Sequence, residues 1–505
     1  MLSSVVGVPV IHLILPRSTA NGLHHVWGHR MVPLGLMTIG ALARREGWEA
    51  VVVDENHEPL PTERPDLVGI TAWTLFAPRA YEIADAYREQ GVPVVLGGAH
   101  PSLLPGEALR HADAVVVGEA ESILAEVLRD ALAGTMSGLY RGSWDDLSDT
   151  PTLDELGPFY DRFPALRYWP QYSVQSTRGC RYNCDYCSVI RINGRGQRHR
   201  SPGVVVDELR RRTARTRFTA GLFFTDDDFG SELDWTMELL TAMAAARLPV
   251  KWAAQTSIGI ARNEELLALA RAAGCSSFFL GLESVTRASL KEANKKNRPQ
   301  EYGELVARIH EHRIGVEGGF VLGFDTDGPD VFDDTVDFAD EIGVDVGFFS
   351  VLTPLPGTGT FDRYWSEGRI VDFDWSHYSL LRAVFEPAQM TAAELDAGVL
   401  RAFGRFYGRR RRARRYARQL RQLPPDYATV LALVGRGFAK EYRRRRHATA
   451  DTARPFQAHP ADLEQLARTS KAPASEAIWL AADQVDGGVA DGVPTRHAVP
   501  VTIGR

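Results

Sequence analysis

The stretch STRGCRYNCDYCSVIRINGRGQRHRSP, residues 176–202, contains three of the chain's four cysteines. Cys180, Cys184 and Cys187 form a C-x3-C-x2-C pattern, so one short segment can bring three thiolates to a single point. A structural zinc site usually needs four nitrogen or sulfur ligands, whereas a four-iron cluster held by three thiolates keeps one iron open. The pattern favours a 4Fe-4S cluster. A zinc knuckle completed by His199, or buried thiols that only pack, are the alternatives.

The composition is that of an ordinary globular protein with room for several domains. The chain has 505 residues, of which 44% are hydrophobic and 24% charged, and its net charge of −6 gives no reason to expect a nucleic-acid partner. Four cysteines do not make a disulfide framework and favour a reducing compartment. The sequence shows no secretion signal and no apolar run of about 18 residues, so we expect a cytoplasmic protein.

Residues 1–140 alternate short apolar runs with helical patterns. Runs rich in valine, isoleucine and leucine predict a parallel sheet covered on both faces, an α/β Rossmann-like domain. Ligands of such sheets bind beyond the carboxyl ends of the strands. Candidate binding residues at these ends are Thr71, Gly97, Gly98 and Gly118, where glycine lets a large planar ligand approach the backbone closely.

After a predicted linker at 141–170, a strand-plus-helix unit repeats. Six apolar strands, beginning near 171, 221, 250, 276, 315 and 346, predict a partial (β/α)6 barrel over residues 171–368, with functional residues at the strand carboxyl ends. Residues 369–446 read as a mainly helical region, and residues 447–505 as a poorly structured tail. The basic stretches at 409–415 and 443–446 are a solvated helix face, an interfacial helix on anionic lipid, or a site for a phosphate-bearing substrate or RNA, of which the overall acidity disfavours RNA.

The cysteine pattern and its surroundings resemble the radical S-adenosylmethionine (SAM) superfamily. The segments PLGLMTIGALARREG (33–47), VVLGGAHPSLLPGEAL (94–109) and AVVVGEAE (114–121) are similar to the cobalamin-binding module that precedes many radical SAM domains. RIVDFDWSHYSLLRAVFEP (369–387) looks like the segment that follows the barrel in cobalamin-dependent radical methyltransferases of the hopanoid-methylase type. The D-x-H-x-x-G motif is absent, so we expect cobalamin to bind without a histidine ligand.

The resemblance implies a role for each candidate residue. Cys180, Cys184 and Cys187 would hold a 4Fe-4S cluster whose open iron binds SAM, and the cobalamin would lie at Thr71, Gly97, Gly98 and Gly118. The remaining candidates would contact SAM. Tyr186 would pack near the adenine, and Asp226 and Asp227 would bind the methionine ammonium. The contacts with the ribose and the methionine would come from Gln255, Ser257 and Glu283.

The implied activity is that of a C-methyltransferase. Members of this class act on an unactivated carbon through a 5′-deoxyadenosyl radical and methylcobalamin. A radical SAM enzyme that cyclises or rearranges a small molecule, with the cobalamin domain only structural, would share every motif, and an iron–sulfur electron carrier is a third interpretation. Expected partners are a small-molecule substrate, a reductant such as flavodoxin or ferredoxin, and a membrane surface touched peripherally by the basic C-terminal helix; no nucleic acid is expected.

Overall fold

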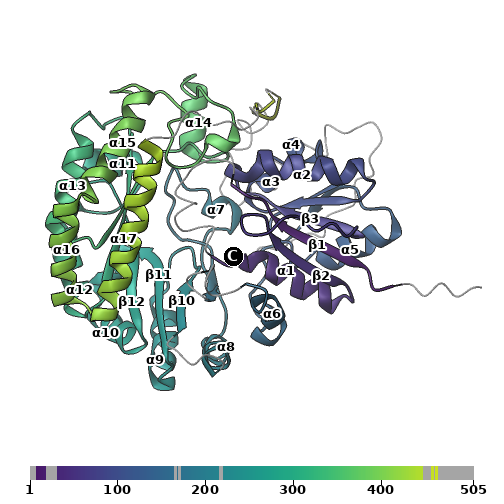
Figure 1. The fold of residues 1–505 in the computed structure, drawn as a ribbon, viewed down its shortest axis with the longest axis horizontal. Coiled ribbons are helices and arrows are strands. Elements are labelled where there is room, and N and C mark those ends of the chain that lie inside the picture. Colours follow the sequence, from purple (N-terminus) through teal and green to yellow (C-terminus); the bar gives the residue numbers. More distant parts are fainter. Residues whose placement is uncertain are drawn as a thin grey trace, which may run out of the picture.

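The computed structural model describes residues 7–18, 31–163, 168, 172–214, 220–446, 457–459 and 461–463. Two parallel sheets stand beside each other, each with helices packed on it, and the C-terminal helices run along the outside of the second (Figure 1). Most of the predicted tail at 447–505 lies outside the described residues. Among the described helices, none is both long and apolar enough to span a bilayer.

The first sheet has the strand order β2-β1-β3-β4-β5-β6, with all strands parallel. Its strands are β1 (Val10–Leu15), β2 (Glu49–Asp54), β3 (Leu67–Thr71), β4 (Val94–Gly97), β5 (Ala114–Val117) and β6 (Gly138–Arg141). Apolar side chains of α1 (Leu34–Arg45) and α5 (Leu124–Ala133) pack on one face, and those of α2 (Ala77–Glu89), α3 (Ala99–Leu103) and α4 (Pro105–Leu109) on the other. The strand order reverses between β1 and β3, which is where sheets of this kind open a ligand crevice.

The second sheet has the order β14-β13-β12-β11-β10-β7, and within the described residues β14 and β7 do not pair, so the barrel is open as predicted. Its strands are β7 (Tyr172–Val174), β10 (Ala220–Phe224), β11 (Val250–Ser257), β12 (Cys275–Glu283), β13 (Gly315–Leu322) and β14 (Val346–Val351). The helices after them are α8 (Pro202–Ala214), α9 (Leu233–Ala246), α10 (Glu264–Ala272), α11 (Arg287–Glu292), α12 (Tyr302–Glu311) and α13 (Val331–Ile342).

The strand predicted from residue 171 to 179 is divided in the structure. β7 ends at Val174, and Thr177–Arg178 form a separate strand, β8, antiparallel to β9 (Arg198–His199). The division arises because the backbone N–H groups of Ser176 and Thr177 donate to the carboxylate of Asp226 instead of to a neighbouring strand. The three cysteines lie between β8 and β9, in a segment we call the cluster loop, residues 179–197.

The region predicted as a linker contains regular structure. β6 adds a sixth strand to the first sheet and ends where the predicted linker begins. Within the linker, α6 (Leu153–Tyr160) begins with a capping box in which Thr152 and Glu155 satisfy each other's backbone groups. The α6 helix contacts both α1 and α8, so it lies between the two sheets. The ring of Tyr160 in α6 packs edge-on against that of Tyr172 in β7, with the ring centroids 5.5 Å apart.

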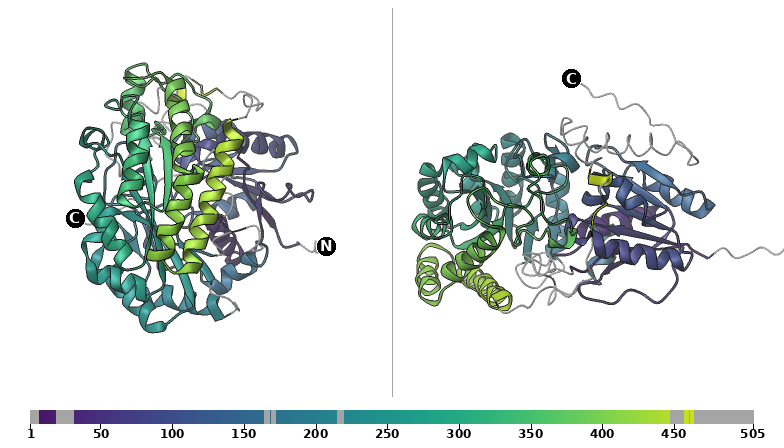
Figure 2. Two further views of the ribbon diagram at one scale, coloured as in Figure 1. Left: turned by 60° about the vertical axis from the view of Figure 1, so that its left-hand side comes forward. Right: turned by 90° about the horizontal axis from the view of Figure 1, so that it is seen from above.

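The C-terminal region is helical, with α14 (Gly359–Ser366), α15 (Ala392–Phe406), α16 (Arg409–Gln422) and α17 (Pro425–Arg446). α15 packs beside β14, and α16 and α17 form a pair along the outside of the barrel (Figure 2). Part of the arginine-rich stretch packs against the barrel, because Arg411 and Arg415 of α16 form ion pairs with Asp340 of α13. Only the other side of α16 faces outward.

Candidate cofactor sites

The cluster loop presents its three thiols together at the carboxyl end of the barrel. Cys180, Cys184 and Cys187 are free and half-buried. The loop is fastened to the barrel by backbone hydrogen bonds from Asp185 N to Ala293 O at 3.2 Å and from Thr360 N to Asp185 O at 3.0 Å. The fourth cysteine, Cys275, is fully buried as the first residue of β12, at the other end of the sheet. Three thiols without a fourth fit a cluster that keeps one iron open.

Burial raises the pKa of Cys180 and of Cys187 to about 12, and it also raises the pKa of Cys184. Cys180 and Cys184 lie close enough to Cys187 to raise its pKa further, which shows that the three sulfurs share one neighbourhood. Iron binds thiolates, so cluster assembly must release protons that burial otherwise retains.

The zinc alternative finds no support in this geometry. In the described part of the chain, no three cysteine, histidine or acidic side chains converge on the position of a single metal ion. His199, which would complete a zinc knuckle, instead stacks on Trp235 with ring centroids 5.0 Å apart. A four-iron cluster spaces its thiolates more widely than one ion does, so this observation bears on zinc alone.

Two of the three aspartates after β10 hold the cluster loop and the residues just before it. Asp226 is fully buried and accepts hydrogen bonds from Ser176 N at 2.7 Å and Thr177 N at 3.1 Å. Asp227 accepts from Gly179 N at 2.8 Å and from Asn193 Nδ2 at 2.9 Å. Their predicted contact with the SAM ammonium stays a prediction, because the contacts described here are with the protein itself.

The third aspartate, Asp228, has one carboxylate oxygen without a hydrogen-bond partner within the described residues. Its Oδ1 accepts from Ser257 N at 2.7 Å, whereas Oδ2 is buried and has no hydrogen-bond partner within the described residues. Burial raises the pKa of this carboxyl, and Asp228 in turn lies near enough to Cys180 to raise the pKa of that thiol. A buried acceptor without a partner, beside the cluster thiols, suits a ligand ammonium. Asp228 is therefore a better candidate than either neighbour.

Glu283, Lys295 and Tyr186 meet beside the thiols, and Lys295 lies near enough to Asp228 to lower the pKa of its carboxyl against the larger effect of burial. Lys295 Nζ lies 3.0 Å from Glu283 Oε1, and both side chains are nearly buried. Glu283 has φ +65°, a strained conformation for glutamate, and a side chain at Gly281 would come within 2.3 Å of its Oε1. Burial raises the pKa of Tyr186, and Glu283, Cys184 and Cys187 raise it further. Sequence reasoning missed Lys295, which lies in a polar KKN stretch that reads as surface.

The remaining predicted SAM contacts, Gln255 and Ser257, lie at the carboxyl end of β11 as expected. Gln255 Nε2 donates to Asp227 O at 3.2 Å. Along β11 the odd-numbered residues are half-buried and the even-numbered ones buried, so Gln255 and Ser257 point to the same, less covered face of the strand. The barrel thus brings every predicted SAM contact to one end of the sheet.

At the carboxyl edge of the first sheet the predicted cobalamin residues lie together, and their close contacts are with the protein itself, so their contact with cobalamin stays a prediction. Gly98 has φ +96°, and a Cβ there would lie 2.7 Å from Thr71 Oγ1. Gly118 has φ +84° and donates its N–H to Ser102 Oγ at 3.0 Å, which itself donates to Gly98 O at 2.8 Å. Gly97 needs no unusual backbone and has ordinary space for a side chain. Sequence reasoning missed Ser102, which links the two glycines with positive φ.

His100 is the histidine nearest to this edge along the chain, but its ring is engaged with the protein. It is fully buried, with Nε2 3.0 Å from Glu107 Oε1 and Nδ1 3.3 Å from Thr74 Oγ1. Glu107 also accepts from Trp375 Nε1 at 3.0 Å, in a short turn (η6, Trp375–His377) after the barrel. His100 therefore belongs to a buried network between the two domains and is not free to bind cobalt.

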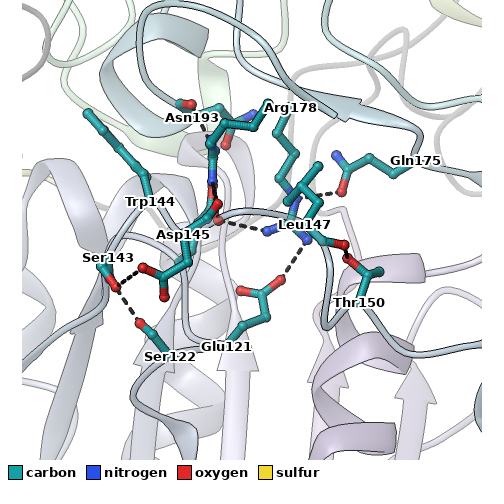
Figure 3. A network of polar contacts seen from close by, with 12 residues as sticks. Glu121, Ser122, Ser143, Trp144, Asp145, Leu147, Thr150, Gln175, Arg178 and Asn193 are labelled. Atoms are coloured by element: carbon teal, nitrogen blue, oxygen red, sulfur yellow. Dashed lines mark hydrogen bonds and ion pairs between the residues drawn. The ribbon is translucent and has the colours of Figure 1, made fainter. Parts of the chain in front are cut away.

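The two cofactor edges are in direct contact. Arg178, two residues before the first cysteine, reaches Glu121 Oε1 at 2.6 Å and Glu119 Oε2 at 2.9 Å, just beyond β5. Figure 3 shows Arg178 directed at Glu121 on one side and Gln175 on the other. Nearby, Trp144 Nε1 donates to Ile192 O at 2.8 Å, so residues after β6 also hold the cluster loop.

Comparison with known proteins agrees with both halves of this arrangement. Residues 174–339 match the Radical SAM superfamily, and residues 22–128 match the B12 binding domain. The bacteriochlorophyllide d C-12(1)-methyltransferase of Chlorobaculum tepidum is 33% identical over 373 residues, covering 72% of this chain and 80% of the relative. The anaerobic magnesium-protoporphyrin IX monomethyl ester cyclase of Cereibacter sphaeroides is 27% identical, covering 70% of this chain and 62% of the relative.

Among solved structures, the radical SAM methyltransferase TsrM from Kitasatospora setae, with cobalamin and a 4Fe-4S cluster bound, has a TM-score of 0.57. The match covers 95% of this chain and 100% of that one at 17% identity, so it confirms the predicted fold alone. The family matches confirm the predicted enzyme class and its three cofactors, the 4Fe-4S cluster, SAM and cobalamin. The chain therefore belongs to the radical SAM superfamily, among the cobalamin-dependent methyltransferases that combine a B12 binding domain with a radical SAM barrel.

Proposed function

We propose that this enzyme methylates an unactivated carbon of a small-molecule substrate held between the two sheets. The observation behind the proposal is the direct contact of the two carboxyl edges, where Arg178 of the barrel meets Glu119 and Glu121 of the first domain. When bound, the cluster and SAM supply a radical that removes hydrogen, and cobalamin supplies the methyl group. Such chemistry needs both cofactors on one substrate, and only adjoining edges permit that.

The protein's own part begins with binding SAM beside the cluster. Cys180, Cys184 and Cys187 would hold the cluster, and the unpaired Oδ2 of Asp228 would accept the ammonium of the methionine portion. Lys295 lies near Cys184 and is held there by Glu283, so its charge would offset that of the cluster's thiolates and of the methionine carboxylate. These groups would fix SAM in one orientation and exclude water from it.

An apolar, planar substrate body is the class to test first. The half-buried face of the barrel strands presents aromatic rings, among them Phe279 and Phe348, whose ring centroids lie 4.9 Å apart. Gly319 faces Phe279 on the next strand, where a Cβ would lie 3.0 Å from the ring. Two relatives carry tetrapyrrole substrates in their names, and aromatic side chains favour flat apolar ligands.

The decisive experiment is anaerobic reconstitution of the full chain with iron, sulfide and hydroxocobalamin, followed by incubation with a low-potential reductant such as dithionite and with SAM carrying a trideuterated methyl group. We expect 5′-deoxyadenosine, S-adenosylhomocysteine and a tetrapyrrole product that retains the deuterated methyl. Protein that binds no cobalamin, or that cleaves SAM without ever labelling a product from a tetrapyrrole panel, would count against the proposal.

Cyclisation is the second candidate, because one relative is a cyclase. The same assay separates the two activities. A cyclised product loses hydrogens and contains no deuterium, whereas a methylated product gains the labelled group. A labelled product would therefore indicate methyl transfer, and an unlabelled, lighter product would indicate ring closure.

Electron supply and membrane contact complete the proposal. A one-electron reductant such as flavodoxin or ferredoxin would serve the cluster in a reducing, cytoplasmic setting. The outward side of α16 exposes Tyr416 and Leu420 among arginines that are themselves exposed: Arg409, Arg410, Arg414 and Arg421. Exposed apolar side chains within a cationic helix face suit an anionic lipid surface. Flotation with phosphatidylglycerol vesicles should carry the protein upward, and loss of flotation in Arg410→Ser/Arg414→Ser would identify this face as the contact; wild-type protein that stays at the bottom would refute it.

A further inference from the structure

Both ends of the cluster loop are tied together by a two-residue ribbon. Strands β8 and β9 pair Thr177 with His199 and Arg178 with Arg198. Residues directly opposite in an antiparallel pair project to the same face. The two arginines therefore stand side by side on one face of the ribbon, with all three cysteines in the loop between them.

Two carboxylates of the other domain offset the charge of this pair: Glu121 contacts Arg178, and Glu119 contacts both arginines. Glu119 Oε2 lies 2.9 Å from both Arg178 Nη1 and Arg198 Nη1, and its Oε1 pairs with Arg198 Nη2. Its side chain is 10% exposed, and those of the arginines are 12% and 19% exposed. Ion pairs that are largely removed from water are not easily replaced by solvent. Without Glu119, Arg178 would keep its ion pair with Glu121, but no carboxylate of the described residues would bridge the two guanidinium groups.

The backbone is closely packed both around Glu119 and around the two arginines. Gly179 has φ +95°, and a Cβ there would lie 2.1 Å from Gly196 O across the cluster loop. A Cβ at Gly142 would lie 1.7 Å from Glu119 O. Arg198 also donates to Asn193 O at 3.0 Å, within the cluster loop itself. Glu119 is thus fixed relative to its own sheet, and the arginines are fixed relative to the cluster loop.

We propose that Glu119 is a positioning residue that sets the separation of the two cofactor sites by clamping both ends of the cluster loop to the cobalamin-binding edge. The proposal rests on the proposed function, in which both cofactors act on one substrate. Glu119 directly follows Gly118, a predicted cobalamin contact just beyond β5, and Arg178 lies two residues before Cys180, a predicted cluster ligand. The clamp therefore connects residues adjacent in sequence to the two cofactor sites. The cluster ligands and the SAM contacts come from the barrel and do not depend on it.

The test uses the full chain, loaded with cluster and cobalamin, and the isosteric variant Glu119→Gln. The main readout is the electron paramagnetic resonance of cob(II)alamin beside the reduced cluster, where proximity of the two spins speeds relaxation. We expect that enhancement to be lost in Glu119→Gln, while 5′-deoxyadenosine formation stays within about twofold of wild type, as for changes remote from the reacting groups. The conservative Glu119→Asp variant, which keeps the charge, should recover part of the enhancement.

Glu155→Gln is the matched control, because Glu155 forms an ion pair with Arg45 between α1 and α6, away from the cluster loop. It should leave the relaxation enhancement unchanged. An enhancement in Glu119→Gln equal to that of wild type would overturn the inference, and so would equal losses in Glu119→Gln and Glu155→Gln. Wild-type protein that binds no cobalamin would instead refute the proposed function. Should Glu119→Gln fail to fold, Glu119→Asp decides the question: an enhancement below that of wild type supports the clamp, and one equal to wild type overturns it.

Discussion

The two ends of the barrel sheet both bury acidic side chains, but they use them differently. At the amino end, Asp345 accepts from Val316 N at 2.9 Å, lies 2.9 Å from His310 Nε2 and is 3.7 Å from Arg418 of α16, and Glu317 accepts from Ser277 Oγ at 2.7 Å. Asp345 Oδ1 has no hydrogen-bond partner within the described residues, but the nearby Arg418 offsets its charge, whereas at the carboxyl end Asp228 Oδ2 lies beside the thiols with neither a hydrogen bond nor an ion pair within those residues. The amino end therefore stabilises the sheet, and the carboxyl end has groups left for ligands.

The largest expected effect comes from comparing cysteines at the two ends. Cys184→Ala should remove one cluster ligand, so the variant should lose the iron–sulfur absorbance and reduce SAM cleavage to background. Cys275→Ala is the matched control at the amino end, where the thiol is fully buried. It should retain cluster and activity and lose only about 1–2 kcal/mol of stability to the small cavity. Equal loss of the cluster in both variants would contradict the contrast between the ends.

The next effect concerns the unpaired oxygen at the carboxyl end. Asp228→Asn removes the charge that would hold the SAM ammonium, so the affinity for SAM should fall about 10–100-fold, the value of a charge-assisted hydrogen bond. The cluster should still assemble, because the cysteines are untouched. Isothermal titration with SAM, alongside iron quantification, measures both quantities. If the affinity for SAM is unchanged in Asp228→Asn but falls in Asp227→Asn, then Asp227 binds the ammonium, as the sequence predicted.

Much of this contrast could be predicted from the sequence. The apolar runs predicted both parallel sheets and the open barrel, and the cysteine spacing predicted the end at which the cluster belongs. The choice among Asp226, Asp227 and Asp228 could not be predicted, because it depends on how the cluster loop folds back and occupies two of them. Lys295 was missed since a lysine in a polar stretch reads as surface, and β8 is too short to produce a pattern.

The helix that braces the amino end provides the third prediction. Arg415 donates to Asp340 Oδ1 at 2.7 Å and to Phe406 O at 3.1 Å, and its guanidinium lies 3.5 Å from the centre of the Phe406 ring. Arg415→Ala should destabilise the protein by about 2–4 kcal/mol, because it breaks a largely buried ion pair and packing together. Urea denaturation measures the loss. SAM cleavage below the melting range should be unchanged.

Arg414→Ala is the control for that measurement, because Arg414 is exposed on the same helix. It should change the free energy of unfolding by less than about 0.5 kcal/mol. A loss of SAM cleavage in folded Arg415→Ala would show that the amino end also supports catalysis, which would break the comparison.

The smallest effect is a pH dependence at the amino end. Burial raises the pKa of Glu317 to about 7. A carboxyl whose folded pKa lies above its unfolded value contributes most to stability at low pH, and that contribution decreases as the pH rises from the unfolded pKa of about 4.3 to the folded one. Replacing Glu317 by glutamine keeps an uncharged side chain at every pH. Relative to wild type, Glu317→Gln should therefore gain about 1–2 kcal/mol between pH ~5 and ~8. Urea midpoints measured across this range test the sign. If Glu317→Gln instead loses stability relative to wild type as the pH rises, Glu317 is ionised in the folded protein and stabilised by charges at the amino end.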